Sequence, residues 1–400
     1  MLEYVLLALI GCLLGVVTGL TPGLHVNTVC LIGLGMYSSM GLDAIGFGTA
    51  MVAMSLTHTF LDFIPSIFLG VPEEETALSV LPAHKLVLKG RAMDAVKLTA
   101  YGSILGLVFG LAMLVPALYI IPIVYNSIRG FVIYIVMAAA AYLILRERKT
   151  RGKIWAVIIM AMSGVLGVIA LNMDSISSTY VLFPVFAGLF GLSGLIYSIK
   201  NEPQTIPQQE HSRAKIDRNI LGSGLLGAIG GAVVGVLPAM SPSQVGVIMS
   251  SIFGTNTQNF LVSVSAINTS DAIYSLVSLY TIQNPRSGVA VMLDRIIELD
   301  MNTLILFTGV FALSGSIATV MHIAIGRRAA RGFNVLNYRL LSSAVLVFVL
   351  ALVYTFTGIM GLLVAMASTA IGLLPILAGV SRTHLMGVLI VPTAMYFLGI

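Results

Sequence analysis

The sequence predicts an all-α, polytopic integral membrane protein, and three observations lead to this fold class. Of the 400 residues, 58% are hydrophobic and only 9% are charged, whereas a soluble domain carries about 25% charged residues. Apolar stretches long enough to span the hydrocarbon core, about 20 residues each, recur along the whole chain. The 40 glycines suit helices that pack closely in lipid. We therefore expect a multi-pass protein of the plasma membrane, surrounded by membrane lipids.

A polar linker divides the apolar segments into two groups. Residues 201–218 read NEPQTIPQQEHSRAKIDR and show no apolar period, which is typical of a loop. We expect a first transmembrane repeat over 1–200, the linker over 201–218 and a second repeat over 219–400. The predicted segments are 2–20, 24–40, 44–70, 95–122, 127–145, 154–172 and 178–199, then 219–237, 240–254, 258–282, 301–325, 338–357, 359–380 and 383–400.

The two groups resemble each other in sequence. GCLLGVVTGLTPGL begins at Gly11 and GAIGGAVVGVLPAM begins at Gly227. Farther along, SLTHTFLD (55–62) resembles SAINTSD (265–271). Two similar motifs in the same order indicate a duplicated unit. An offset of 216 superimposes Gly11, Gly15, Val17, Gly19 and Pro22 on Gly227, Gly231, Val233, Gly235 and Pro238.

The basic residues predict how the two repeats lie in the membrane, because Lys and Arg concentrate in cytoplasmic loops. If segment 44–70 runs from outside to inside, only Arg129, Arg286 and Arg295 of the 21 Lys and Arg residues lie outside. The repeats then have inverted topology, each with a broken or re-entrant helical hairpin followed by about five transmembrane helices, as in many secondary transporters. The sequence leaves open whether 1–40 and 219–254 span the membrane or re-enter it. The cytoplasmic loops are 71–97, 146–153, 200–218, 327–339 and the loop with Arg382. This loop pattern explains the net charge of +5, and we expect no nucleic acid.

Each repeat has a break in a helix at membrane depth. The first copy breaks at 20–23 (Leu-Thr-Pro-Gly) and the second at 237–242 (Leu-Pro-Ala-Met-Ser-Pro), because Pro and Gly interrupt a helix. Such backbone survives in a membrane only where protein buries it or a cavity hydrates it, and a helix that starts there suits an anion. The alternative is that the polar residues only cap helices. The predicted substrate-binding residues are Thr21, Gly23, His25, Asn27, Thr28, Ser241, Ser243 and Gln244.

Ionisable residues inside predicted spans point to a coupling site. His58 and Asp62 are four residues apart and share a helix face, and Asp271 lies in the similar segment beside Asn268 and Thr269. A carboxylate within a span is costly and usually functional. We expect a proton or Na⁺ site here. The alternative is structural carboxylates satisfied by Ser and Thr.

Other chemistry is disfavoured. No H-E-x-x-H or Cys/His cluster occurs, so we expect no metal site, no cofactor and no catalytic residues. The run of Glu73, Glu74 and Glu75, with His84 and the basic residues after it, is typical of a solvated cytoplasmic loop.

Three stretches resemble a known family. They are GVVTGLTPGL (15–24), PEEETALSVLPAHKLVLKGRAMDAVKLTAYGSILG (72–106) and FPVFAGLFGLSGLI (183–196). They are similar to the large membrane subunit of tripartite tricarboxylate transporters. The resemblance implies a cation-coupled carrier of small carboxylates that works with a small membrane subunit and an extracytoplasmic binding protein.

The sequence thus favours a secondary transporter, not an enzyme, that moves an organic anion such as a carboxylate with H⁺ or Na⁺. One alternative is a carrier of polyprenyl-phosphate or a similar lipid-linked anion. Others are an intramembrane enzyme that pairs Asp62 with Asp271, and a scaffold. Whether the chain forms a homo-oligomer is left open.

Overall fold

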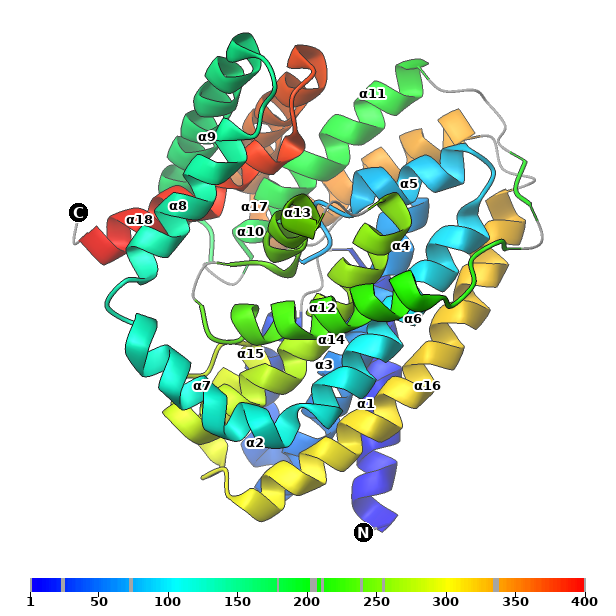
Figure 1. Ribbon diagram of the computed structural model, residues 1–400. Helices are drawn as coiled ribbons and strands as arrows, with labels where there is room; N and C mark the ends of the chain where they lie inside the picture. Colours follow the sequence, from blue (N-terminus) through cyan, green and yellow to red (C-terminus); the bar gives the residue numbers. More distant parts are fainter. Residues whose placement is uncertain are drawn as a thin grey trace.

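The computed structural model describes residues 2–22, 26–71, 75–177, 180–201, 207–209, 212–237, 240–253, 256–333 and 338–398. Across these ranges every regular element is a helix (Figure 1), so the all-α prediction is confirmed. The helices are α1 (Leu2–Leu20), α2 (Val26–Met40), α3 (Ala44–Leu61), α4 (Phe63–Phe68), α5 (Val80–Leu88), α6 (Ala92–Ala112), α7 (Leu114–Ile128), α8 (Val132–Leu145), α9 (Thr150–Leu171), α10 (Leu182–Phe186), α11 (Ser193–Asn201), α12 (Arg218–Val234), α13 (Pro242–Phe253), α14 (Thr257–Ile282), α15 (Gly288–Ile296), α16 (Met301–Phe333), α17 (Tyr338–Ala378) and α18 (Gly387–Leu398), with a π-helical turn at Ala187–Leu192 and a 3-10 turn at Arg382–Met386.

Seven helices of the described chain are long and apolar enough to cross a membrane, which confirms a multi-pass protein. An eighth span is formed if α7 and α8, bent by 87° at their junction, are counted as one. The short helices α2 and α13 have 15 and 12 residues, or about 22 and 18 Å, and neither covers a hydrocarbon core of about 30 Å. The spans are Leu2–Leu20, Ala44–Phe68, Ala92–Ala112, Thr150–Leu171, Thr257–Ile282, Met301–Gly332 and Ser342–Ala378.

Two predicted boundaries show how Pro and Gly shape the helices. The sequence predicted one segment over 95–122, and this is wrong, because α6 ends at Ala112 and α7 begins at Leu114. Pro116, in the first turn of α7, has no N–H to donate to the carbonyl of Ala112, and this favours the end of α6. The predicted division between 357 and 359 coincides with Gly358, whose φ of 64° kinks α17.

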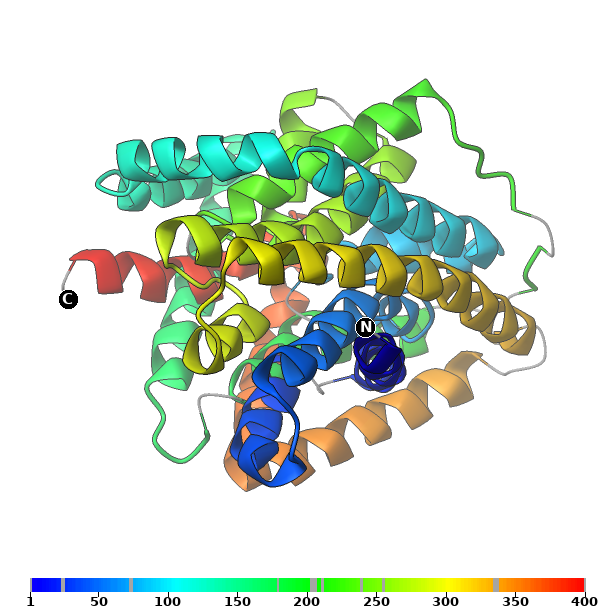
Figure 2. The ribbon, with the colours of Figure 1, turned by 90° about the horizontal axis from the view of Figure 1, so that it is seen from below.

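Two helices form the centre of the molecule. In α3–α4 and in α14, 89% of the apolar window is buried, against 28–56% in the other five spans. α1 packs along α3, and α12 packs along α14. Figure 2, seen from below, looks along α1 and shows α16 crossing beside it. Helices α8, α9 and α18 pack against one another apart from this centre, at the upper left of Figure 1.

Glycines reveal equivalent packing in the two halves. A Cβ on Gly11 of α1 would clash with Ala50 of α3. A Cβ on Gly227 of α12 would clash with Ala266 of α14. The two glycines are 216 residues apart in the sequence, and so are the two alanines. Gly15 and Gly231 meet Met54 and Ser270, again at an offset of 216, and Gly19 and Gly235 meet His58 and Tyr274.

This register corrects one part of the sequence comparison. The similarity of 55–62 to 265–271 uses an offset of 210, whereas the glycine contacts continue the offset of 216 through α3 and α14. With this offset, Asp271 of α14 is equivalent to Ser55 of α3, and Tyr274 of α14 is equivalent to His58 of α3. The local similarity arises because both helices carry Ser, Thr and amide or imidazole side chains toward one place. The inverted orientation of the halves and the repeat boundaries stay predictions.

Candidate functional site

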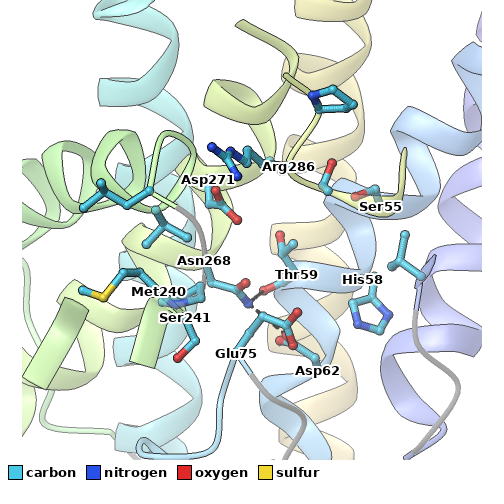
Figure 3. Close-up of a pocket in the computed structure, with 17 residues that line it drawn as sticks. Ser55, His58, Thr59, Asp62, Glu75, Met240, Ser241, Asn268, Asp271 and Arg286 are labelled. Carbon is cyan, nitrogen blue, oxygen red and sulfur yellow. Dashed lines mark hydrogen bonds between the residues drawn. The ribbon is translucent and has the colours of Figure 1, made fainter. Parts of the chain in front are cut away.

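A cavity of about 340 Å³ lies between α3, α14 and the starts of α2 and α13 (Figure 3). We call it the central cavity. Its volume is within the range of small-molecule sites. The lining residues are Val26, Ser55, His58, Thr59, Asp62, Glu75, Val234, Leu237, Met240, Ser241, Pro242, Asn268, Asp271, Ala272, Pro285, Arg286 and Ser287.

Helix α3 presents four polar side chains to the central cavity. Ser55, Thr59 and Asp62 follow one another at helical spacing and share a face. His58 lies on the same wall, and its Nδ1 is 3.1 Å from the Oγ1 of Thr18 on α1. The sequence prediction that His58 and Asp62 share a face is confirmed.

Helix α14 supplies the opposite wall. The Nδ2 of Asn268 donates to Asp62 Oδ2 over 2.9 Å and to the carbonyl of Thr59 over 3.4 Å. Asp271, one turn farther along, also faces the central cavity (Figure 3). Four of the five predicted coupling residues thus meet at one place. Thr269 is fully buried but is not among the lining residues.

The starts of α2 and α13 meet at the central cavity, because Val26 and Pro242 both line it. Ser241 and Gln244 form a capping box at the start of α13. Gln244 Oε1 accepts from Ser241 N over 2.9 Å, and Ser241 Oγ accepts from Gln244 N over 3.3 Å. Helix starts of this kind carry a partial positive charge.

The predicted substrate residues have different positions. Of the eight, only Ser241 lines the central cavity among those with described side chains. Ser243 instead donates to the carbonyl of Glu75 and accepts from Leu78 N at 3.4 Å. Gln244 caps its helix, and Thr21 is not a lining residue. Gly23 and His25 lie outside the described residues, and for Asn27 and Thr28 only the helical backbone is described.

The prediction of a solvated loop after α4 is wrong for two of its residues. Glu75 lines the central cavity, and His84 is buried on α5 with its Nδ1 2.8 Å from the carbonyl of Ile67. Because the chain folds back after α4, segment 75–78 packs against α13 through Ser243. Three consecutive Glu residues in the sequence resembled a charged loop. The only signal of burial was the apolar sequence of α5 that follows.

Arg286 also lines the central cavity, whereas the sequence predicted it only as a residue of an outside loop. It follows α14, and Figure 3 shows it beside Asp271. Its Nε is buried and makes no hydrogen bond with the described residues. A buried donor without an acceptor is costly, so this guanidinium is suited to an anionic ligand.

The central cavity combines charges of both signs. Among the described lining residues, Asp62, Glu75 and Asp271 contribute carboxyl groups and Arg286 contributes a guanidinium. Buried carboxyl groups either take up protons or hold cations. Within the described chain, no three His, Cys, Asp or Glu side chains are arranged to hold a metal ion. The cavity thus contains a group that suits an anion, Arg286, and carboxyl groups that suit a proton or a cation.

Comparison with known proteins accounts for nearly the whole chain. Residues 5–387 match the family described as "Tripartite tricarboxylate transporter TctA family". An uncharacterized protein from Methanocaldococcus jannaschii is 31% identical over 401 residues, which cover 98% of both chains. No solved structure matches.

Proposed function

Because the chain belongs to the tripartite tricarboxylate transporter TctA family and is a multi-pass membrane transporter component, we propose that it carries a small organic anion, such as a carboxylate, with H⁺ or Na⁺. The observation that carries the proposal is the central cavity, where Arg286 lies together with the carboxyl groups of Asp62, Glu75 and Asp271. The family match and the predicted inverted repeat both support a secondary transporter.

The anion binds, in this proposal, at Arg286 and near the starts of α2 and α13. A guanidinium holds a carboxylate through two parallel hydrogen bonds. The buried Nε of Arg286 makes no hydrogen bond with the rest of the described protein, so it can donate to such a ligand. The starts of α2 and α13 add positive partial charge at the same cavity. Ser241 supplies a hydroxyl group there.

The carboxyl groups couple anion binding to a cation. An anion that enters beside Asp62, Glu75 and Asp271 is repelled if all three are ionised, because like charges in a low-dielectric site interact strongly. Proton uptake or Na⁺ binding removes this repulsion, so the cation raises the affinity for the anion. By linkage, the anion raises the affinity for the cation equally. Transport follows if the loaded and empty cavities prefer different open states.

Partner subunits complete the proposal. The family is a tripartite transporter family, so its members work with other subunits. We infer that these are a small membrane subunit and an extracytoplasmic binding protein that delivers the anion.

The test is uptake by proteoliposomes under imposed pH or Na⁺ gradients, with labelled citrate and succinate as probes and the partner subunits added. We expect Asp271→Asn to leave folded protein but remove the dependence of uptake on the gradient, because an amide neither takes up the proton nor holds the cation. Asp62→Asn has the smaller effect in this proposal, since His58 lies one turn away.

The matched control is Asp174→Asn, a substitution of an exposed carboxylate outside the central cavity, and it should transport as the unmodified protein does. Gradient-driven uptake of normal size in the Asp271 variant would show that this carboxylate is structural. Competition by polyprenyl phosphate, with no effect of citrate or succinate, would instead support the lipid-linked anion.

A further inference from the structure

A second cavity of about 250 Å³ lies beside α13, and segment 75–78 contributes lining residues to it and to the central cavity. It is formed by parts of the chain that are distant in sequence: the start of α5, the α8–α9 loop, α13 and the 3-10 turn at Arg382–Met386. Its lining residues are Ala77, Leu78, Pro82, Arg146, Val247, Ser250, Phe260, Ser381, Arg382 and Thr383.

Arg382 is held rigidly in the wall of the second cavity by uncharged groups. Its Nη2 donates to the carbonyls of Leu189 and Phe190 over 2.9 and 2.8 Å, and to Ser193 Oγ over 2.7 Å. The guanidinium carbon also lies 5.3 Å from the centre of the Phe190 ring. These contacts fix the side chain but leave its positive charge unbalanced.

The charge of Arg382 has no carboxylate partner among the ion pairs of the described residues. Burial lowers the pKa of its guanidinium to about 10, so the group is still charged at neutral pH. Its Nε is buried and makes no hydrogen bond with the described chain. Arg382 as a whole is partly buried, and a guanidinium in such a position gains stability from an anion that pairs with it.

Arg146 adds a second positive charge. Its Nη1 donates to Ser251 Oγ of α13, and the residue lines both the second cavity and a neighbouring, larger one of about 760 Å³. Among the described residues that line that larger cavity, the acidic side chain is Glu147, which is bound to Ser381 N and His384 Nε2, both over 3.0 Å. The larger cavity is lined by Leu143, Arg146, Glu147, Arg148, Lys149, Arg151, Gly152, Leu377, Ala378, Gly379, Val380, Ser381 and Thr383.

The second cavity lies less than the length of α13 from the central cavity. Pro242 of α13 lines the central cavity, and Ser250, eight residues farther along, lines the second. This separation corresponds to about 12 Å along the helix axis. Segment 75–78 also serves both, since Glu75 faces one cavity and Leu78 the other.

We propose that the second cavity is an anion-binding site of its own, in which Arg382 and Arg146 hold a small carboxylate or phosphate anion. It takes the transported anion on its way to or from the side of the 146–153 loop, which the charge pattern places in the cytoplasm. The binding chemistry rests on Arg382 and Arg146, and the transport role rests on the proposed function.

The test uses the purified full-length protein in detergent, with citrate and inorganic phosphate as separate probes in isothermal titration. We expect Arg382→Gln and Arg146→Gln each to weaken binding at this site by at least about tenfold, the effect of losing one charge-assisted hydrogen bond. The matched control is Arg148→Gln, which removes a charge from the same loop but not from the second cavity, and it should bind normally.

Arg382→Gln also removes contacts to the π-helical turn and could unfold the protein. Arg146→Gln leaves those contacts intact and keeps the proposal testable. Normal titrations for this variant, or no binding of either probe to the unmodified protein at millimolar concentration, would overturn the second site. The proposed function is tested separately by Arg286→Gln, which should abolish uptake and leave binding in the second cavity.

Discussion

Gly231 of α12 controls the position of Asp271, and its substitution by Ala tests the central cavity through packing alone. A Cβ at Gly231 would lie 2.8 Å from Asp271 N and 3.0 Å from the carbonyl of Ile267, and closer still to Ser270 Oγ. Ordinary contacts begin at 3.4 Å, so the α14 backbone must move by about 0.6 Å, as the difference between 3.4 and 2.8 Å shows. Overpacking of this kind costs about 1–3 kcal/mol of folding free energy.

The functional effect of Gly231→Ala follows from the same displacement. Binding groups must be held within about 0.5 Å of their productive positions, and the shift moves the helix that carries Asn268 and Asp271. We expect lower stability in detergent, followed by circular dichroism, and weakened citrate uptake per folded molecule in proteoliposomes.

The matched control is Gly222→Ala, on the same helix but with no atom within 4 Å of its added Cβ. Because Ala has the higher helix propensity, this substitution should stabilise the protein by up to about 1 kcal/mol and leave uptake unchanged. Equal stability and equal uptake in the two variants would refute the packing argument and the role assigned to this wall of the cavity.

Two further predictions concern other regions. Burial raises the pKa of Glu147, but hydrogen bonds from Ser381 N and His384 outweigh it and hold the pKa below its usual value of 4.5. The stabilisation is therefore complete above pH 4.5 and is lost as the pH falls through the folded-state pKa. Glu147→Gln should cost about 1–2 kcal/mol at pH 7 and less at pH 3, measured by chemical unfolding in detergent; an equal cost at both pH values would contradict this. Gly358→Ala should cost about 1–3 kcal/mol, because the residue has a φ of 64° and a ψ of −159°, a conformation that is essentially limited to glycine, although nothing lies near its Cβ position; an unchanged melting temperature would show that α17 straightens there without strain.

Much of the fold follows from the sequence because bilayer thickness and helix breakers act locally. Gly358 marks a kink that its neighbours in sequence already indicate, and Asp62 and Asp271 stand out because carboxylates inside apolar spans are rare. The residues from distant loops were harder. Glu75 lies in a run of acids that resembles a solvated loop, and only the reversal of the chain after α4 brings it to the central cavity. Arg286 was predicted to lie in an outside loop because of the charge pattern. Nothing in the local sequence shows that this loop turns toward the central cavity.

The register of the two halves shows a similar limit. Short polar motifs aligned at an offset of 210, whereas the glycines of α1 and α12 pack at 216. The spacing of the glycines shows the true register of the helices, because each of these glycines contacts the neighbouring helix where a side chain would not fit. Polar residues can converge on one cavity from positions that are not equivalent.

The bonds of Ser243 have a mechanical consequence. This residue joins the start of α13, in the second half of the chain, to the backbone of Glu75 and Leu78 in the first half. If one half rotates against the other at this corner, the bonds must break, whereas a movement of α13 together with segment 75–78 preserves them. Each is a bond between uncharged groups, worth about 0.5–1.5 kcal/mol. Together they hold the start of α13 weakly against segment 75–78, between the two cavities. A ligand that binds the open state more tightly by about 1–3 kcal/mol is enough to break both bonds.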